Sequence, residues 1–219
     1  MGQSARLLAA TAILFCASAS AADLAVRVDD GHGRAVADAV VTVLPRDPAA
    51  QPAPARRAPA RRTIDQKDLA FVPYVATLRP GDEVVFHNSD RTRHHVYSFS
   101  PVKAFEFVLA PGETSAPQQL DKTGVVAVGC NIHDRMIAYL YVSDAPWIAL
   151  TDAGGRVDLE GLPAGAYDVR VWQPRLRPGR PDLVRSGVVL GATESKTLAF
   201  ALPLLPDSRL QFDREHTDY

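Results

Sequence analysis

The sequence predicts an all-β protein that contains two β-sandwiches. Short runs rich in Val, Ile, Tyr and Phe recur along the chain, and many alternate apolar with polar residues. Gly, Pro, Asn and Asp separate these runs at short intervals, as turns do in sandwiches. After residue 22 almost nothing shows the apolar period of a helix. The length of 219 residues allows two small domains, and 47% hydrophobic with 22% charged residues is typical of folded proteins.

The first 22 residues, MGQSARLLAATAILFCASASAA, have the pattern of a secretory signal peptide. An early Arg precedes an apolar middle, and small residues follow at the end. The apolar stretch is too short to remain as a membrane span, and no later stretch is long enough to cross a bilayer. We therefore expect cleavage before Asp23 and a mature protein in the periplasm.

The mature chain divides by composition into five parts. Residues 23–45 carry the strand-like runs LAVRVDD and AVVTVLP, and residues 46–62, rich in Pro, Ala and Arg, are predicted to form an extended linker. Residues 63–144 hold several predicted strands, among them EVVF, HHVYSFS, AFEFVL, GVVAVGC and IAYLYV. Residues 145–205 alternate further strand-like runs with DAGG and LPAG turns, and residues 206–219 are polar enough to form a loose tail.

Two segments far apart in the sequence resemble the opening and the closing of one known kind of sandwich. VRVDDGHGRAVADAVVTVLP and TDAGGRVDLEGLPAGAYDVRVW are similar to the two ends of carboxypeptidase-regulatory-like domains. The resemblance implies that residues 63–144 are inserted into a host sandwich built from residues 23–45 and 145–205. The alternative is a tandem arrangement in which the first strands join the middle domain.

The net charge and the cysteine content limit the classes of function that the sequence supports. A formal net charge of −1 gives no reason to expect a nucleic-acid partner. Of the two cysteines, Cys16 would leave with the signal peptide, so the mature protein would keep only Cys130. Exported proteins normally pair their cysteines. A single one is an inert buried thiol, a reactive thiol, half of an intermolecular bridge or a metal ligand.

The residues near Cys130 in the sequence favour the metal-ligand interpretation of this cysteine over the other three. In GCNIHDRM, His133 and Met136 follow Cys130 at three-residue intervals, and RTRHHVYSFS offers His94 and His95 earlier in the chain. One thiolate, two imidazoles and a weak axial thioether are the ligand set of blue-copper electron-transfer sites. Neighbouring residues on a strand point to opposite faces, so one of the two adjacent histidines is expected to bind. Each residue alone has an ordinary structural role, but the combination predicts one copper ion.

Other chemistries fit this set less well. Structural zinc favours two or more cysteines and no Met, and iron–sulfur clusters need more thiolates. A cysteine nucleophile with His133 as base and Asn131 as orienting residue would leave Met136 without a role. We therefore expect no enzyme activity.

The middle domain resembles the cupredoxins, the plastocyanin–amicyanin family. LRPGDEVVFHNSD, HHV at His94–Val96 and the Cys-x-x-His-x-x-Met spacing carry the resemblance, which covers residues 63–144. It implies a Greek-key β-sandwich with His94, Cys130, His133 and Met136 as copper ligands. His95 stands where the family has an Asn that ties the two ligand-bearing segments together, so His95 either takes over that tie or faces the other side of the strand.

The resemblance implies a periplasmic one-electron carrier that meets a dehydrogenase or a cytochrome transiently. RHHVYSFSPVKAFEF is also similar to cupredoxin-like proteins associated with methylamine utilisation. Ile132, Ile137, Tyr139 and Tyr141 are candidates for an apolar collar that fits the partner, and the edge of His133 is expected to pass the electron. The alternatives are copper binding and delivery without electron transfer, or a structural sandwich protein in which copper is secondary.

Overall fold

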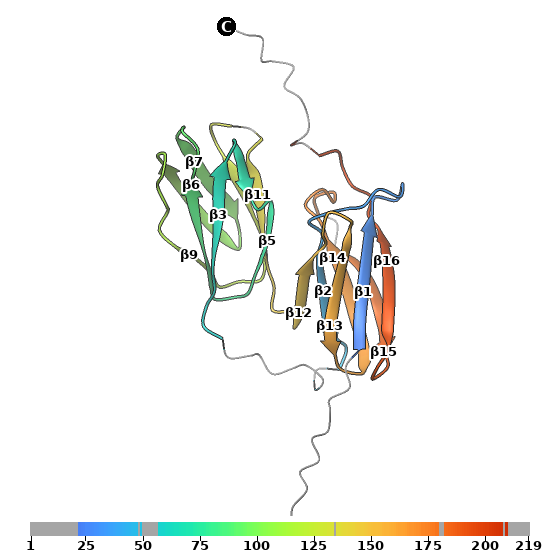
Figure 1. Ribbon diagram of the computed structural model, residues 1–219. Helices are drawn as coiled ribbons and strands as arrows, with labels where there is room; N and C mark the ends of the chain where they lie inside the picture. Colours follow the sequence, from blue (N-terminus) through green and yellow to red (C-terminus); the bar gives the residue numbers. More distant parts are fainter. Residues whose placement is uncertain are drawn as a thin grey trace, which may run out of the picture.

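The structure, a computed structural model, describes residues 22–47, 49, 57–133, 135–179, 182–207 and 209. In these residues sixteen β-strands form four sheets, and the sheets pack in pairs as two β-sandwiches (Figure 1). The predicted all-β class with two sandwiches is confirmed. Ala22 is the first residue of β1, and the rest of the predicted signal peptide lies outside the described residues. Within the described part of the chain, we find no helix with the length and hydrophobicity needed to cross a membrane.

The first sandwich combines both ends of the chain. Its three-stranded sheet has the order β13-β1-β16 and its four-stranded sheet the order β12-β2-β14-β15. The bounds are β1 Ala22–Asp29, β2 Val40–Pro45, β12 Trp147–Leu150, β13 Arg156–Leu162, β14 Gly165–Trp172, β15 Leu183–Leu190 and β16 Ser195–Ala201. One apolar core lies between the two sheets and includes Leu24, Val41, Val169 and Phe200.

Strand β1 is held on both sides by strands from the far end of the sequence. It pairs antiparallel with β13, where Ala25 faces Asp158, and parallel with β16, where Ala25 faces Thr197. Strand β2 lies between β12 and β14 in the other sheet. Among the described residues, both N-terminal strands therefore pair with strands that follow residue 144 and with none of β3 to β11.

The second sandwich is formed by the middle of the chain. Its sheets have the orders β5-β11-β10-β7-β8 and β4-β3-β6-β9. The bounds are β3 Arg61–Lys67, β4 Ala70–Val72, β5 Val75–Leu78, β6 Asp82–Asn88, β7 His94–Ser100, β8 Lys103–Leu109, β9 Gln118–Leu120, β10 Gly124–Cys130 and β11 Ile137–Val142. Its core lies between the sheets and includes Phe86, Val96 and Leu140, with Cys130 and Met136 at one end of the sandwich.

The prediction that the linker extends to residue 62 is wrong at its end. Strand β3 begins at Arg61, and it pairs in parallel with β6, so that Arg61 faces Glu83 and the two side chains form an ion pair at 2.8 Å. The sequence lacks an alternating apolar pattern here, because Ile64 and Gln66 are the two inward-facing residues and Gln66 is polar. Pairing with a distant strand outweighs this weak local preference. Residues 48 and 50–56 of the predicted linker lie outside the described residues.

Asp82 fastens the beginning of β3 to the turn before β6. Its buried carboxylate accepts hydrogen bonds from the Ala60 N–H and the Arg79 N–H, each at 2.8 Å, and from the Arg57 guanidinium at 2.8 Å. Burial opposes ionisation, but these hydrogen bonds and the charge of Arg57 outweigh it and lower the pKa of Asp82. The ionised carboxylate is thus the form that the folded protein stabilises.

Asp82→Asn is expected to lower the free energy of unfolding by about 1.5–3 kcal/mol at neutral pH, since it removes charge-assisted hydrogen bonds. The pKa of Asp82 is lower in the folded than in the unfolded protein, where an aspartate titrates near pH 3.9. The stabilisation is therefore complete above that pH and is lost as pH falls through the folded pKa. Urea unfolding between pH 7 and pH 3 measures it, with Asp121→Asn, an exposed carboxylate, as control. A difference that does not shrink at low pH would contradict this assignment.

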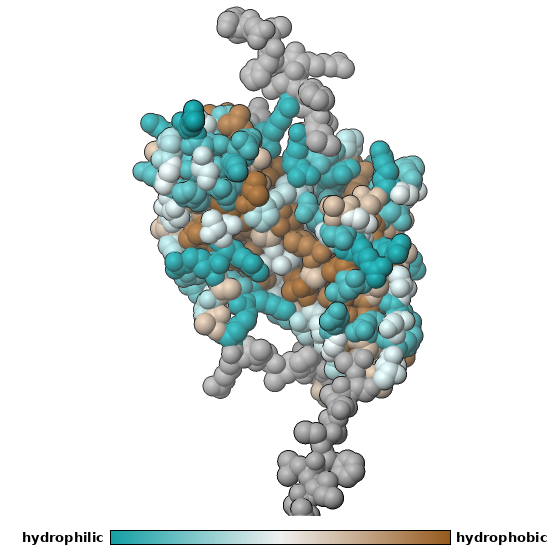
Figure 2. All heavy atoms as spheres, in the orientation of Figure 1, coloured by the Kyte–Doolittle hydropathy of each residue, from teal (hydrophilic) through white to brown (hydrophobic). Residues whose placement is uncertain are grey.

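The two sandwiches meet through aromatic side chains. Trp172 of β14 contacts Tyr139 and Tyr141 of β11, with ring centroids 5.9 and 5.2 Å apart. The Tyr141 hydroxyl also donates a hydrogen bond of 3.2 Å to Asp182. In the view of Figure 2, apolar residues gather in the middle of the molecule, along this junction. The outer face of the five-stranded sheet is thus covered at β11 by the first sandwich.

The C-terminal segment also crosses to the second sandwich. The Arg209 guanidinium lies 3.4 Å from the ring centroid of Tyr74 and forms an ion pair with Asp207 at 2.7 Å. These two described residues of the predicted loose tail therefore have defined contacts. Residues 208 and 210–219 lie outside the described residues.

Candidate metal centre

Three elements of the second sandwich bring potential ligands to the same end. His94 is the first residue of β7, Cys130 is the last residue of β10, and His133 lies in the loop that joins β10 to β11. The loop is closed by two backbone hydrogen bonds, from the Met136 N–H to the His133 carbonyl at 3.0 Å and from the Cys130 N–H to the Met136 carbonyl at 3.1 Å. The short sequence spacing therefore produces a tight loop that returns directly into β11.

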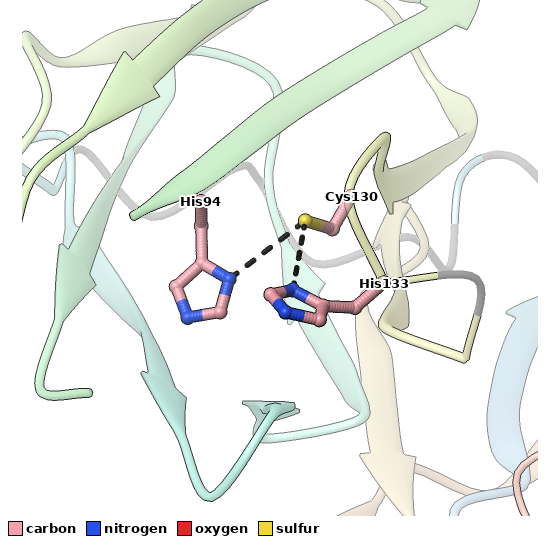
Figure 3. A group of neighbouring side chains, drawn as sticks. All are labelled: His94, Cys130 and His133. Atoms are coloured by element: carbon pink, nitrogen blue, oxygen red, sulfur yellow. Dashed lines mark hydrogen bonds between the residues drawn. The ribbon is translucent and has the colours of Figure 1, made fainter. Parts of the chain in front are cut away.

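The side chains of His94, Cys130 and His133 converge (Figure 3). The Cys130 Sγ lies 3.8 Å from the Nδ1 of His94 and 3.8 Å from the Nδ1 of His133, and the two rings have centroids 5.0 Å apart. Metal–sulfur bonds of about 2.3 Å and metal–nitrogen bonds of about 2.1 Å place such donor atoms roughly 3.5–3.8 Å apart. The donor set and its spacing therefore fit a single metal ion.

Burial distinguishes the three residues. His94 is 0% and Cys130 5% exposed, whereas His133 is partly exposed. Met136 is 2% exposed and belongs to the core cluster that includes Cys130. Its backbone closes the loop, and its side chain is buried at the same end of the sandwich. The role of Met136 as axial ligand stays a prediction.

The structure separates the two adjacent histidines. His94 faces inward to Cys130, whereas His95 faces the other side of the sheet, where its Nε2 lies 2.8 Å from the Glu106 carboxylate. The His95 carbonyl accepts a hydrogen bond of 3.0 Å from the Asn131 N–H, and its ring Nδ1 lies 3.5 Å from the Asn131 amide nitrogen. His95 thus faces away from the cluster, as one of the two expectations had it, and its backbone carbonyl connects the two segments that carry the cluster.

Asp90 orients the His94 ring. The Asp90 carboxylate lies 2.9 Å from His94 Nε2, the nitrogen that faces away from Cys130. A carboxylate at this position fixes the proton on Nε2 and leaves the lone pair of Nδ1 directed at the site. Asp90 also accepts the N–H groups of Asp68 at 2.7 Å and Leu69 at 3.1 Å. Burial opposes ionisation of Asp90, but the hydrogen bonds from His94, Leu69 and Asp68 outweigh it and lower its pKa.

Asn88 in turn holds the segment that carries Asp90. It is 0% exposed, its Oδ1 accepts the Asp90 N–H at 3.0 Å, and its Nδ2 donates to the carbonyls of Thr92 and Leu109. Sequence reasoning did not assign a role to Asp90 or Asn88. The signal was available in FHNSDRTRH, because an Asx residue in a turn four residues before a histidine can reach its ring.

The predicted apolar collar is only partly present. Ile132 is 51% exposed beside His133, and Ile137 is partly exposed at the end of the loop. Tyr139 and Tyr141 contact Trp172 of the first sandwich, so the prediction that they face a partner protein is wrong. The pattern of the strand predicted their outward direction, but only the tertiary structure shows that another part of the chain covers them.

Comparisons with known proteins yield similar solved structures. No family model matches the sequence, and no curated protein matches it. A copper-containing nitrite reductase from Thermus scotoductus SA-01 is 25% identical over 46% of this chain and 27% of its own, with a TM-score of 0.36. Amicyanin from Paracoccus versutus is 17% identical over 47% of this chain and 98% of its own, with a TM-score of 0.35.

A purple cupredoxin from Nitrosopumilus maritimus is also similar, 20% identical over 38% of this chain and 99% of its own, with a TM-score of 0.33. This chain thus spans about a quarter of the nitrite reductase, as its 27% coverage shows, and nearly all of each small cupredoxin. At these TM-scores the similarity does not define a function.

Proposed function

We propose that this protein is a mononuclear copper protein that carries single electrons. The observation that supports this most directly is the convergence of Cys130 Sγ with the Nδ1 atoms of His94 and His133. Met136, buried at the same end of the sandwich, is the proposed weak axial ligand. Two imidazoles and one thiolate with a distant thioether suit copper, whereas closed structural zinc sites favour more thiolates.

A bound copper ion would supply a one-electron couple between Cu(I) and Cu(II). The protein's contribution is to hold the donor atoms in nearly one arrangement for both states. His94 and Cys130 lie at strand ends and are buried, and Asp90 fixes the His94 ring. His133 is the partly exposed member of the cluster, so its ring edge is the proposed contact with solvent and with an electron-transfer partner.

Copper delivery without electron transfer is the alternative function. Transfer of an ion requires exposed or mobile ligands, and the burial of His94 and Cys130 argues against rapid release. The same burial supports a carrier rather than an enzyme, because a substrate would have no direct approach to Cys130.

We further propose that the protein is exported to the periplasm, that the copper domain is inserted into the first sandwich, and that the redox partner is a dehydrogenase or a cytochrome. The strand order β13-β1-β16 supports the insertion, since the chain leaves the first sandwich after β2 and returns to it at β12. Arg79 supports a fixed path of the chain between the two sandwiches. Its guanidinium donates hydrogen bonds to the carbonyls of Ala145 and Pro146, just before β12. The first sandwich is therefore a scaffold that holds both ends of the copper domain.

The visible absorption spectrum of the purified protein titrated with Cu(II) tests the proposal. We expect an intense orange-red band that saturates at about one copper per protein, bleaches with ascorbate and is absent in Cys130→Ser, because the thiolate is the chromophoric ligand. His95→Ala, which changes the adjacent histidine outside the cluster, should keep the band. A colourless copper complex, or equal copper binding by Cys130→Ser, would contradict a thiolate-copper carrier and favour the delivery or structural functions.

A further inference from the structure

The outer face of the five-stranded sheet carries an exposed aromatic pair. Tyr97 and Phe99 lie on the same side of β7, with ring centroids 5.2 Å apart, and Phe99 is 75% exposed. Val108 on the neighbouring β8 is 50% exposed, and Ala104, opposite Phe99, is also exposed. A solvent-facing sheet surface is normally polar. An apolar group of this kind on a folded protein indicates a contact surface.

This surface continues a face that is already used for packing. On the same side of the sheet, Tyr139 faces Ala127 of β10 in register, and Tyr139 contacts Trp172 of the first sandwich. The first sandwich therefore covers the β11 side of this face and leaves the β7 and β8 side open. The His95 imidazole and the Glu106 carboxylate of the open part lie 2.8 Å apart and pair with each other. The side chains that the open face exposes beyond this pair include the apolar Phe99 and Val108.

The open face also lies beside Cys130. Gly129 precedes Cys130 and faces Tyr97 across the β10–β7 pair. The Tyr97 ring lies directly over Gly129, so that a Cβ atom at this glycine would be 2.8 Å from the Tyr97 Cζ and 2.9 Å from its hydroxyl oxygen. The absence of a side chain at residue 129 lets an aromatic ring approach the backbone next to the thiolate. A short connection therefore runs from Cys130 through Gly129 and Tyr97 to the exposed Phe99.

We infer that the Tyr97–Phe99 face is a docking surface for a one-electron redox protein that presents an apolar, uncharged patch. The inference rests on the proposed copper function and adds a second point of electron exchange, apart from the His133 edge. With copper bound, the site would lose one electron by way of Cys130 and the docked acceptor would gain that electron, with no bond made or broken. Because the proposed contact is made by apolar side chains such as Phe99 and Val108, the association is expected to depend weakly on ionic strength.

Two small oxidants of different surface chemistry test the inference. The copper-loaded, reduced protein is mixed with tris(1,10-phenanthroline)cobalt(III), which has aromatic ligands, or with hexacyanoferrate(III), which is a hydrophilic anion. In Phe99→Ser the rate constant for the cobalt complex should fall about fivefold, the loss typical of truncating an apolar contact residue. The rate with hexacyanoferrate should stay within about twofold. Val189→Ser, 61% exposed on the first sandwich, is the matched control and should change neither rate.

A measurement without copper separates docking from redox chemistry. The redox-inert, paramagnetic tris(1,10-phenanthroline)chromium(III) should broaden the amide resonances around Phe99 in the copper-free protein and lose this effect in Phe99→Ser. Unchanged cobalt rates and unchanged broadening in Phe99→Ser, with slower reactions in Ile132→Ser, would overturn the inference in favour of the His133 edge alone. If the copper-loaded wild-type protein reduces neither oxidant, the proposed carrier function fails and this docking role fails with it.

Discussion

Asp90→Leu is expected to lower the copper affinity by about 10–100-fold, the range typical for loss of a hydrogen-bond partner of a metal-binding histidine. The Asp90 carboxylate lies 2.9 Å from the Nε2 of His94. Without the carboxylate, the ring would lose its fixed tautomer and orientation, and Nδ1 would spend less time directed at the site. Competition with a chromogenic Cu(I) chelator measures the affinity.

The isosteric variant Asp90→Asn separates the orientation of the His94 ring from the effect of the negative charge of Asp90. Its amide oxygen can still accept the Nε2 proton, so we expect a smaller loss of affinity than in Asp90→Leu. The backbone N–H groups of Asp68 and Leu69 would also lose partners in Asp90→Leu, so the stability of each copper-free variant is measured in parallel. Equal copper affinities of wild type and Asp90→Leu would show that packing alone orients His94.

Gly155→Ala is expected to destabilise the first sandwich by roughly 2–4 kcal/mol, through a left-handed backbone conformation and a steric clash. Gly155 has a φ of +69°, and a Cβ atom there would lie 2.4 Å from the Val28 carbonyl oxygen and 2.9 Å from the Val36 nitrogen. Both contacts are with backbone atoms, which cannot move aside as a flexible side chain can. The turn between β12 and β13 therefore requires glycine where it packs against the end of β1.

Urea unfolding followed by tryptophan fluorescence measures the effect, because Trp147 and Trp172 both lie in this sandwich. Gly31→Ala is the matched control, since Gly31 has a φ of +78° in the same sandwich but no atom within 4 Å of the added Cβ. It should show the conformational cost alone, about 1–2 kcal/mol. A loss of stability in Gly155→Ala no larger than in Gly31→Ala would show that the backbone relaxes around the methyl group.

Local pattern was sufficient for most strands but not for all of them, and β3 and β9 were missed. GVVAVGC and HHVYSFS coincide with β10 and β7, because apolar and polar residues alternate there with the period of a strand. Strand β3 was not predicted, because its inward-facing residues include the polar Gln66 and because it begins with Arg61 and Arg62, which suggested a linker. In β3 the decisive interaction is the parallel pairing with β6, which is far away in the sequence.

The sequence by itself determined the β class and the closely spaced group Cys130, His133 and Met136, since both depend on residues near one another along the chain. Only the tertiary structure decided which histidine meets Cys130, because the direction of His94 and His95 depends on how β7 lies in its sheet. It also decided the packing of Tyr139 on Trp172 and of Tyr97 on Gly129. These contacts join residues on separate strands, and their distances follow from sheet register and sandwich packing, which no local pattern encodes.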